Sequence, residues 1–247
     1  MFDIALLLSA AFVAGALNAV AGGGSFLTLP ALVFVGVPPV VANATGTVAL
    51  LPGYAAGAWG FREDTAPPPG LSMRLLVALS LIGGAAGAAL LLVTSNEMFA
   101  IVVPWLLLAA TVLFAFGSQL RNMLAGGGKP STAKATISVL VVAVYGGYFN
   151  GGLGILLLAL FGLLGQTQLN AMNGLKNLVS TLLTAIAVAV YAYGGVVNWR
   201  YALLMMLAAT AGGYIGARVA RRIPAQWLRW GIVATGLVMT GIFFARQ

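Results

Sequence analysis

Long apolar stretches fill most of the chain, and short polar or glycine-rich interruptions separate them. Since about 20 apolar residues are enough to cross the hydrocarbon core of a bilayer, most of these stretches predict membrane-spanning helices. The pattern divides the chain into ten apolar elements, at residues 2–20, 25–37, 41–61, 72–93, 98–120, 134–149, 152–165, 168–194, 200–220 and 225–245. We therefore expect an all-α integral membrane protein.

The second and seventh elements are short for full spans, and each follows a glycine-rich break. Non-helical backbone at membrane depth survives only where protein or a watery cavity satisfies its polar groups. Each break therefore predicts either a broken helix or a re-entrant hairpin.

Three landmarks of the first half recur in the second half in the same order. Asn18 before Gly22–Gly24 matches Asn150 before Gly151, Gly152 and Gly154, and subtracting the residue numbers of the two asparagines gives 132. The segments that begin at Asn43 and Asn173 differ by 130, and the glycine clusters at 83–87 and 212–216 differ by 129. We therefore expect two repeats of about five elements each, at residues 1–122 and 134–247, joined by a polar linker at 123–133.

Composition decides the class of protein. Hydrophobic residues make up 61% of the chain and charged residues 6%, far below the roughly 25% charged residues of a soluble domain. The formal net charge of +8 comes from basic residues at the ends of apolar elements, so we expect contact with lipid headgroups and no nucleic-acid partner. The chain has no cysteine or histidine, which excludes disulfides, thiolate chemistry and imidazole-based metal sites.

The basic residues also predict the orientation. If the fourth, fifth, ninth and tenth elements each cross once, Arg200 and Arg246 fall on one side and nine basic residues on the other. The nine are Arg62, Arg74, Arg121, Lys129, Lys134, Arg218, Arg221, Arg222 and Arg229. The positive-inside rule then places the linker in the cytoplasm and both termini outside, in a bacterial-type inner membrane. Each repeat crosses an odd number of times, so the two are inverted, as in many secondary transporters.

Several motifs resemble a known family over essentially the whole chain. They are the run from Gly15 to Leu32, the segment 36–45, Leu169–Leu178 and the segment 212–218. This combination resembles the TauE/SafE sulfite exporter family. The resemblance implies a transporter of a small anion, such as sulfite, sulfoacetate, a taurine-like sulfonate or thiosulfate. One departure is that the second break carries Asn150 and Leu153 and is less purely glycine than the first.

The two breaks supply chemistry that suits an oxyanion. The first amides of a helix are unpaired and the helix dipole is positive there, so a helix N-terminus attracts anions. Gly22, Gly23 and Gly24 precede one short element, and Gly151 and Gly152 precede the other. We expect both runs to bind substrate near the midplane. The alternative is close packing of small residues, which we favour for the glycine clusters near 83–87 and 212–216.

Lys176 is the only charge well inside an apolar element, and Asn173 and Asn177 share its helix face. No acidic residue lies nearby in the sequence, so an anionic substrate is the natural counter-charge. The alternative is a lysine that snorkels to the interface. Asparagine and hydroxyl side chains complete the predicted substrate site, although capping of helix ends is the alternative role for each of them; these residues are Asn18, Ser25, Asn43, Thr47 and Asn150. No metal, cofactor or catalytic residue is expected.

The acidic residues bear on energy coupling. Asp3, Glu63, Asp64 and Glu97 all lie near the ends of elements, which argues against a carboxylate-based proton antiporter. The membrane potential alone would drive an anion outward, so we predict an exporter. The alternative is an anion or small-solute channel of the same architecture. We find no pair of side chains suited to catalysis, which argues against an enzyme, and a homo-oligomer is compatible with the sequence.

Overall fold

The computed structural model describes residues 2–20, 22–124, 131–219 and 225–245, and every regular element in these ranges is a helix. The helices are α1 (Phe2–Val20), α2 (Ser25–Phe34), α3 (Pro39–Gly60), α4 (Met73–Leu92), α5 (Asn96–Leu124), α6 (Thr132–Tyr148), α7 (Leu153–Leu163), α8 (Leu169–Tyr193), α9 (Trp199–Val219) and α10 (Ala225–Ala245). Their bounds differ from the ten predicted elements by at most four residues, so the all-helical prediction is confirmed.

The outer surface of the described helices is apolar. Large hydrophobic side chains such as Ile82, Val141 and Leu207 are exposed, each by more than half of their area. In the described part of the chain, α4 and α8 are long and apolar enough to cross a membrane by length and composition, and several other helices are apolar but shorter. Such a surface would be insoluble in water and suits contact with lipid.

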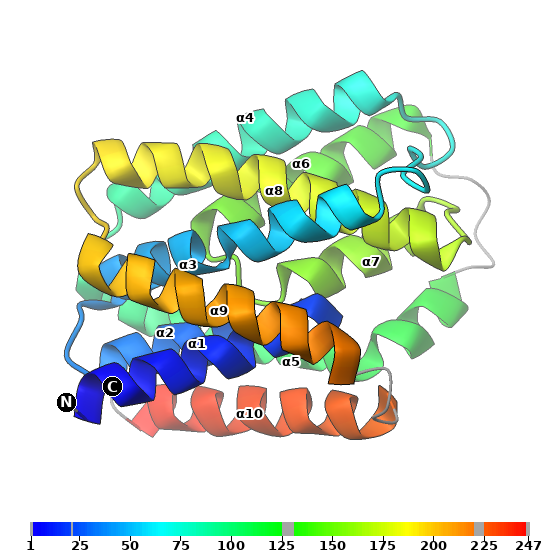
Figure 1. The fold of residues 1–247 in the computed structure, drawn as a ribbon. Helices are drawn as coiled ribbons and strands as arrows, with labels where there is room; N and C mark the ends of the chain where they lie inside the picture. The colour runs from blue at the N-terminus through cyan, green and yellow to red at the C-terminus, as the bar shows by residue number, and fades with distance from the viewer. Residues whose placement is uncertain (1, 21, 125–130, 220–224, 246–247) are drawn as a thin grey trace.

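The helices run roughly parallel or antiparallel to one another, so the molecule has two ends (Figure 1). Both termini lie at one end, here called the terminus end. The α3–α4 and α7–α8 connections lie at the opposite end, here called the distal end. A hydrogen bond ties the connections at each end: Val40 N–H donates to Asn96 Oδ1 at 3.1 Å at the terminus end, and the Gln166 amide donates to the Ala66 carbonyl at 3.2 Å at the distal end.

The two short helices turn back instead of continuing across. In Figure 1, α1 runs inward from the terminus end and α2 returns to that end, while α6 and α7 form the same kind of hairpin from the distal end. With 10 residues in α2 and 11 in α7, each is roughly 15 Å long, about half of a 30 Å hydrocarbon core. Of the two alternatives left open by the sequence, the structure favours the re-entrant hairpin.

The longer helices pack in pairs around these hairpins. Extensive contacts join α1 to α9, α4 to α6, α3 to α8 and α5 to α10. Small residues allow these backbones to approach closely. The backbone of Gly212 contacts the backbone of Phe12, and Gly87 contacts Val144 in the same way. These glycines have the packing role that the sequence predicted for them.

The described basic residues divide between the two ends as the sequence analysis predicted. Arg62, Arg74 and Lys134 lie at the distal end, and Arg200 lies at the start of α9 at the terminus end. The remaining basic residues of the prediction lie outside the residues whose side chains the structure describes; they are Arg121, Lys129, Arg218, Arg221, Arg222, Arg229 and Arg246. Residues 125–130 of the expected linker also lie outside the described residues.

Candidate functional site

The two glycine breaks meet in the interior and form one site, here called the junction (Gly22–Ser25 and Asn150–Gly154). A Cβ added to Gly22 would lie 2.8 Å from the Cα of Gly154, and one added to Gly154 would lie 2.9 Å from the Cα of Gly22. The Ser25 hydroxyl donates to the Asn150 carbonyl at 3.4 Å. Two segments that are far apart in the sequence are therefore in direct backbone contact.

Left-handed backbone turns lead the chain into both short helices. Gly22 has φ +78° and Gly152 has φ +68°, a conformation that glycine adopts without a steric penalty. Asn150 has φ +60°, which asparagine tolerates better than most residues because its short polar side chain bonds locally. After these turns α2 begins with Gly24 as its N-cap and α7 begins with Gly152 as its N-cap.

Backbone amides at the junction lack acceptors. In the described part of the chain, the amides of Gly151, Gly152 and Gly154 donate to no carbonyl, and those of Gly23 and Gly24 also have no partner. All five residues are buried. Unpaired amides at a helix N-terminus, together with the positive end of the helix dipole, form an anion-binding arrangement.

The side chain of Asn150 adds another unpaired donor. Its Oδ1 accepts a hydrogen bond from the Tyr54 hydroxyl at 3.3 Å, while its Nδ2 has no partner among the described residues. The residue is only 1% exposed. Leaving a buried amide donor unpaired costs about 1–3 kcal/mol, so such a group calls for a ligand. Asn18, beside the first break, likewise has an unpaired Oδ1.

Lys176 lies on α8 against the second break. Its aliphatic stem passes α7, since a Cβ on Gly154 would lie 3.3 Å from the Lys176 Cδ. The residue is 2% exposed, so the side chain does not snorkel to the surface. Its ammonium makes no hydrogen bond or ion pair with the described residues. The four acidic residues are all exposed and leave it without a counter-charge.

Asn177, next to Lys176, lines a cavity of about 340 Å³. The cavity lies between α1, α3, α8 and α9, and Asn18 and Tyr54 form part of its wall. Its other lining residues continue along the last turns of α3 and α9, toward the distal end. This cavity therefore extends from the side chains beside the junction toward the distal end, and it is called the vestibule below.

Three of the predicted site residues bond to helix backbone instead of facing the junction. The Asn43 side chain donates to the Tyr148 carbonyl at 2.9 Å and caps the end of α6, and the Thr47 hydroxyl donates to the Asn43 carbonyl at 2.8 Å. Asn173 is partly exposed and donates to the carbonyl of Leu169 in its own helix at 3.1 Å. The structure thus brings together the glycine runs, Ser25, Asn18, Asn150 and Lys176, with Asn177 in the vestibule.

Polar residues that the sequence analysis did not select also lie in the interior. Tyr54 orients Asn150, and Ser180 and Thr184 follow Lys176 on α8. The spacing of Lys176, Ser180 and Thr184 is i, i+4 and i+8, which places all three on one helix face. That spacing was visible in the sequence and could have identified them.

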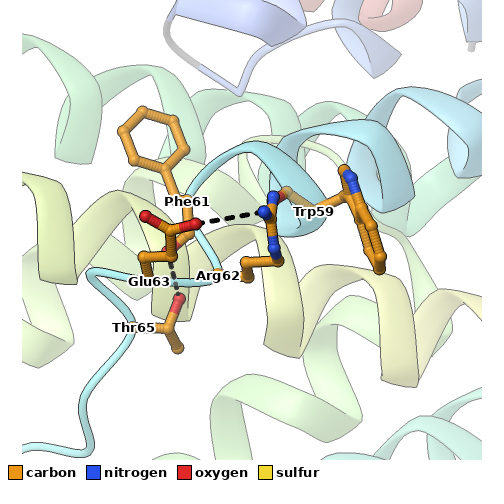
Figure 2. Close-up of polar contacts among 5 residues, drawn as sticks. All are labelled: Trp59, Phe61, Arg62, Glu63 and Thr65. Carbon is orange, nitrogen blue, oxygen red and sulfur yellow. Dashed lines mark hydrogen bonds and ion pairs between the residues drawn. The ribbon is translucent and has the colours of Figure 1, made fainter.

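The rim of the vestibule carries a charged cluster at the end of α3 (Figure 2). Phe61 lines the vestibule, and Arg62 follows it. The Arg62 guanidinium lies 4.7 Å from the centre of the Trp59 ring and pairs with Glu63 at 3.0 Å. Thr65 closes the turn by donating to the Phe61 carbonyl at 2.8 Å. Because the Arg62–Glu63 ion pair is exposed, it contributes little to stability.

Comparison with known proteins identifies the family. The family model described as "Sulfite exporter TauE/SafE" matches residues 7–243, which include both breaks and Lys176. The chain belongs to this family. No solved structure shows a significant match to the chain.

Relatives of this family member carry transporter names. The chain is 27% identical to a "Probable membrane transporter protein" of Haemophilus influenzae, over 96% of this chain and 92% of the relative. It is 28% identical to the "Probable membrane transporter protein ORF9" of a Sinorhizobium species, over 96% and 90% of the two chains. The Escherichia coli K12 "Probable membrane transporter protein YfcA" is 24% identical, over 96% of this chain and 88% of the relative. The TauE/SafE protein described here is a membrane transporter.

Proposed function

We propose that this chain carries a small sulfur-containing anion across the membrane and binds it at the junction. Sulfite, an organosulfonate such as sulfoacetate or a taurine-like compound, and thiosulfate are the candidates. The family description names sulfite export, and the junction offers the donors that an anion of this class needs.

The observation that carries the proposal is Lys176, a buried residue whose ammonium has no partner among the described residues. Removing a charge of this size from water costs several kcal/mol, and a buried charge without a partner is strongly destabilising. Lys176 is 2% exposed and contacts Gly154 at the start of α7. An anion at the junction would neutralise it and recover this cost.

The unpaired donors around Lys176 match the oxygens of a sulfite or sulfonate group. The amides of Gly151, Gly152 and Gly154 and the Nδ2 of Asn150 all lack acceptors in the described structure. Hydrogen bonds to a charged group are worth about 1.5–3 kcal/mol each, more than those between neutral groups. Several oxygens on one substrate could occupy these donors together with the Lys176 ammonium.

The arrangement of helices supports the proposal of two inverted repeats. If each helix of the first half is matched with the helix five places later, the α1–α9 pair becomes the α6–α4 pair, and the α3–α8 and α5–α10 pairs become themselves. The α1–α2 and α6–α7 hairpins also enter from opposite ends. Such an exchange is what a pseudo-two-fold axis in the membrane plane produces, and transporters of this plan bind substrate at the repeat interface.

The direction of transport follows from charge and potential. The distal end carries the described basic residues Arg62, Arg74 and Lys134, so the positive-inside rule places it in the cytoplasm of a bacterial-type inner membrane and both termini outside. The vestibule would then face the cytoplasm. An inside-negative potential favours anion exit by about 2.3 kcal/mol per unit charge at 100 mV, which supports export.

Thermal stabilisation of the purified protein tests this assignment. Sulfite, thiosulfate, sulfoacetate, taurine, sulfate and chloride would each be added, and the unfolding temperature would be measured for the wild type and for Lys176→Ala. A ligand that binds the folded state raises this temperature. We expect one sulfur anion to stabilise the wild type selectively and to have no effect on Lys176→Ala.

The matched control is Lys134→Ala, which removes an exposed lysine from the start of α6 and should keep the full anion response. If every anion leaves the unfolding temperature of the wild type unchanged, the substrate assignment is wrong. If Lys176→Ala responds like the wild type, Lys176 does not bind the substrate.

A further inference from the structure

The vestibule extends from side chains beside the junction toward the distal end, and comparison of the two repeats indicates where an equivalent route would lie. The vestibule runs along α3 and α9. Under the offsets of the repeats, α3 corresponds to α8 and α9 corresponds to α4, so the equivalent route in the other half is the seam between α4 and α8. This seam leads toward the terminus end, because the α1–α2 and α6–α7 hairpins enter the molecule from opposite ends.

Equivalent positions in the two routes differ in burial. On α3, Gly53 is exposed and Gly57 is partly exposed. Their counterparts on α8, Leu183 and Ala187, are completely buried. The same contrast holds between Phe61, which is partly exposed, and Tyr191, which is 1% exposed. The α4–α8 seam is therefore closed where the vestibule is open.

Glycine contacts show the same difference at backbone level. A Cβ on Gly84 of α4 would lie 2.8 Å from the Leu183 Cα and carbonyl oxygen of α8, so the two backbones touch. Its counterpart on α9, Gly213, has no α3 atom within 4 Å of such a Cβ, and its nearest neighbour is the Gly15 carbonyl at 3.5 Å. The α4–α8 seam is closed by this backbone contact.

A hydrogen bond holds the closed side at its outer end. The Tyr191 hydroxyl on α8 donates to the Gly147 carbonyl near the end of α6. The counterpart of Tyr191 is Phe61, which has no hydroxyl and lines the open vestibule. The closed route therefore has a bond that the open route lacks.

Two buried hydroxyl groups on α8, beside the seam residue Leu183, have no partner among the described residues. Most helix hydroxyls, such as those of Ser80, Thr111 and Thr181, donate to the carbonyl four residues earlier. The hydroxyls of Ser180 and Thr184 do not, and both residues are fully buried without a partner among the described residues. Burying a hydroxyl without a hydrogen-bond partner is unfavourable, so both residues lower the stability of the closed arrangement.

The counterparts of these two residues line the open route. Ser180 corresponds to Leu50 and Thr184 to Tyr54, and both Leu50 and Tyr54 form the wall of the vestibule. Two independent observations, the unpaired hydroxyls and their repeat positions, therefore indicate the same face of α8.

We propose that the α4–α8 seam is the second entrance of the transporter, and that Ser180 and Thr184 contact water and substrate when it opens. Opening separates Leu183 from Gly84 and breaks the bond from Tyr191 to Gly147. The unpaired hydroxyls then gain partners, which offsets part of the lost packing. This proposal rests on the proposed transport function, since a carrier must expose its site to each side in turn.

Cysteine labelling tests the proposal directly, because the chain contains no native cysteine. Ser180→Cys and Thr184→Cys would be made singly and exposed to a charged, membrane-impermeant methanethiosulfonate reagent from the side of the terminus end. We expect slow labelling of both. Adding Tyr191→Phe, which removes one hydrogen bond, should accelerate it by about fivefold. Gly84→Ala should also accelerate it, because the new Cβ forces the seam apart.

Matched controls separate opening from general loosening. Gly213→Ala places a Cβ where there is room, so it should leave the labelling rates unchanged. Val179→Cys, which is 1% exposed in the core on the same helix, should stay unlabelled in every background. Ala56→Cys, on the vestibule wall, should label from the distal side.

Two results would overturn the proposal. One is that Ser180→Cys and Thr184→Cys stay unlabelled from the terminus side even with Tyr191→Phe and Gly84→Ala, while Ala56→Cys labels. The other is that Val179→Cys labels as fast as they do. Since labelling needs no substrate, a positive result together with a failed anion test would refute only the substrate assignment.

Discussion

Replacing Lys176 with methionine should stabilise the empty protein while abolishing its response to the substrate. Lys176 is 2% exposed and its ammonium has no partner among the described residues, so the cost of burying the charge is uncompensated when no anion is bound. Methionine keeps an unbranched apolar stem of similar length beside Gly154 and removes the charge. We expect a gain on the order of 2 kcal/mol, equivalent to roughly 4–8 °C for a chain of this length.

The assay is thermal unfolding of the purified variant in buffer without sulfur anions, with Lys134→Met as the control. Lys134 is exposed, so that variant should lie within about 0.5 kcal/mol of the wild type. A Lys176→Met protein that is less stable than the wild type would refute the reasoning, because it would mean that the ammonium already has a favourable partner in the empty protein.

Other changes at and near the junction have distinct expected outcomes. Asn150→Ala should lower stability by about 1–2 kcal/mol more than Asn150→Gly, because alanine is strained at φ +60°, and chemical denaturation of the two variants would show the difference. Tyr54→Phe should weaken anion binding about fivefold in a titration, since the Asn150 amide loses the hydroxyl that orients it; unchanged affinity would contradict this. Asn43→Ala should lower the free energy of unfolding by about 1–2 kcal/mol through loss of the α6 cap, whereas Asn173→Ala should lower it by less than about 0.5 kcal/mol. Equal effects of the two substitutions in chemical denaturation would contradict the assigned contacts.

Much of the fold could be predicted because the hydrophobic pattern of a membrane protein is strong and local. The ends of the described helices fall within four residues of the interruptions in the apolar pattern, many of which contain glycine, proline, asparagine or charged residues. The re-entrant course of α2 and α7 could be given only as one of two alternatives. A short apolar element has the same pattern whether it crosses or turns back, and tertiary packing decides between the two.

The junction was predictable for a different reason. Glycine runs before short helices and a lone intramembrane lysine each point to an anion, and the repeat places the two glycine runs in corresponding positions. The asparagines were harder to assign, because capping and substrate binding use the same amide. Asn43 caps α6 and Asn173 bonds within its own helix, while Asn150 keeps an unpaired donor at the junction. Only the positions of neighbouring carbonyls distinguish these roles, and those depend on the three-dimensional arrangement.

The asymmetry of the two routes was not visible in the sequence. Gly84 and Gly213 occupy equivalent positions in similar motifs, yet one contacts α8 and the other has no contact with α3. Such a difference belongs to one conformational state and not to the pattern of residues. The sequence predicts the repeat, and the structure shows which of the two equivalent seams is in backbone contact.

The most direct test of the central claim is flux of radiolabelled sulfite through proteoliposomes that contain the purified protein. Sulfite would be loaded inside, an inside-negative potential would be imposed, and efflux would be compared between the wild type, Lys176→Met and Lys134→Met. The account predicts saturable efflux that the potential accelerates, that persists in Lys134→Met and that is lost in Lys176→Met. Equal efflux from the wild type and Lys176→Met would contradict it, because the anion would then cross without the buried lysine.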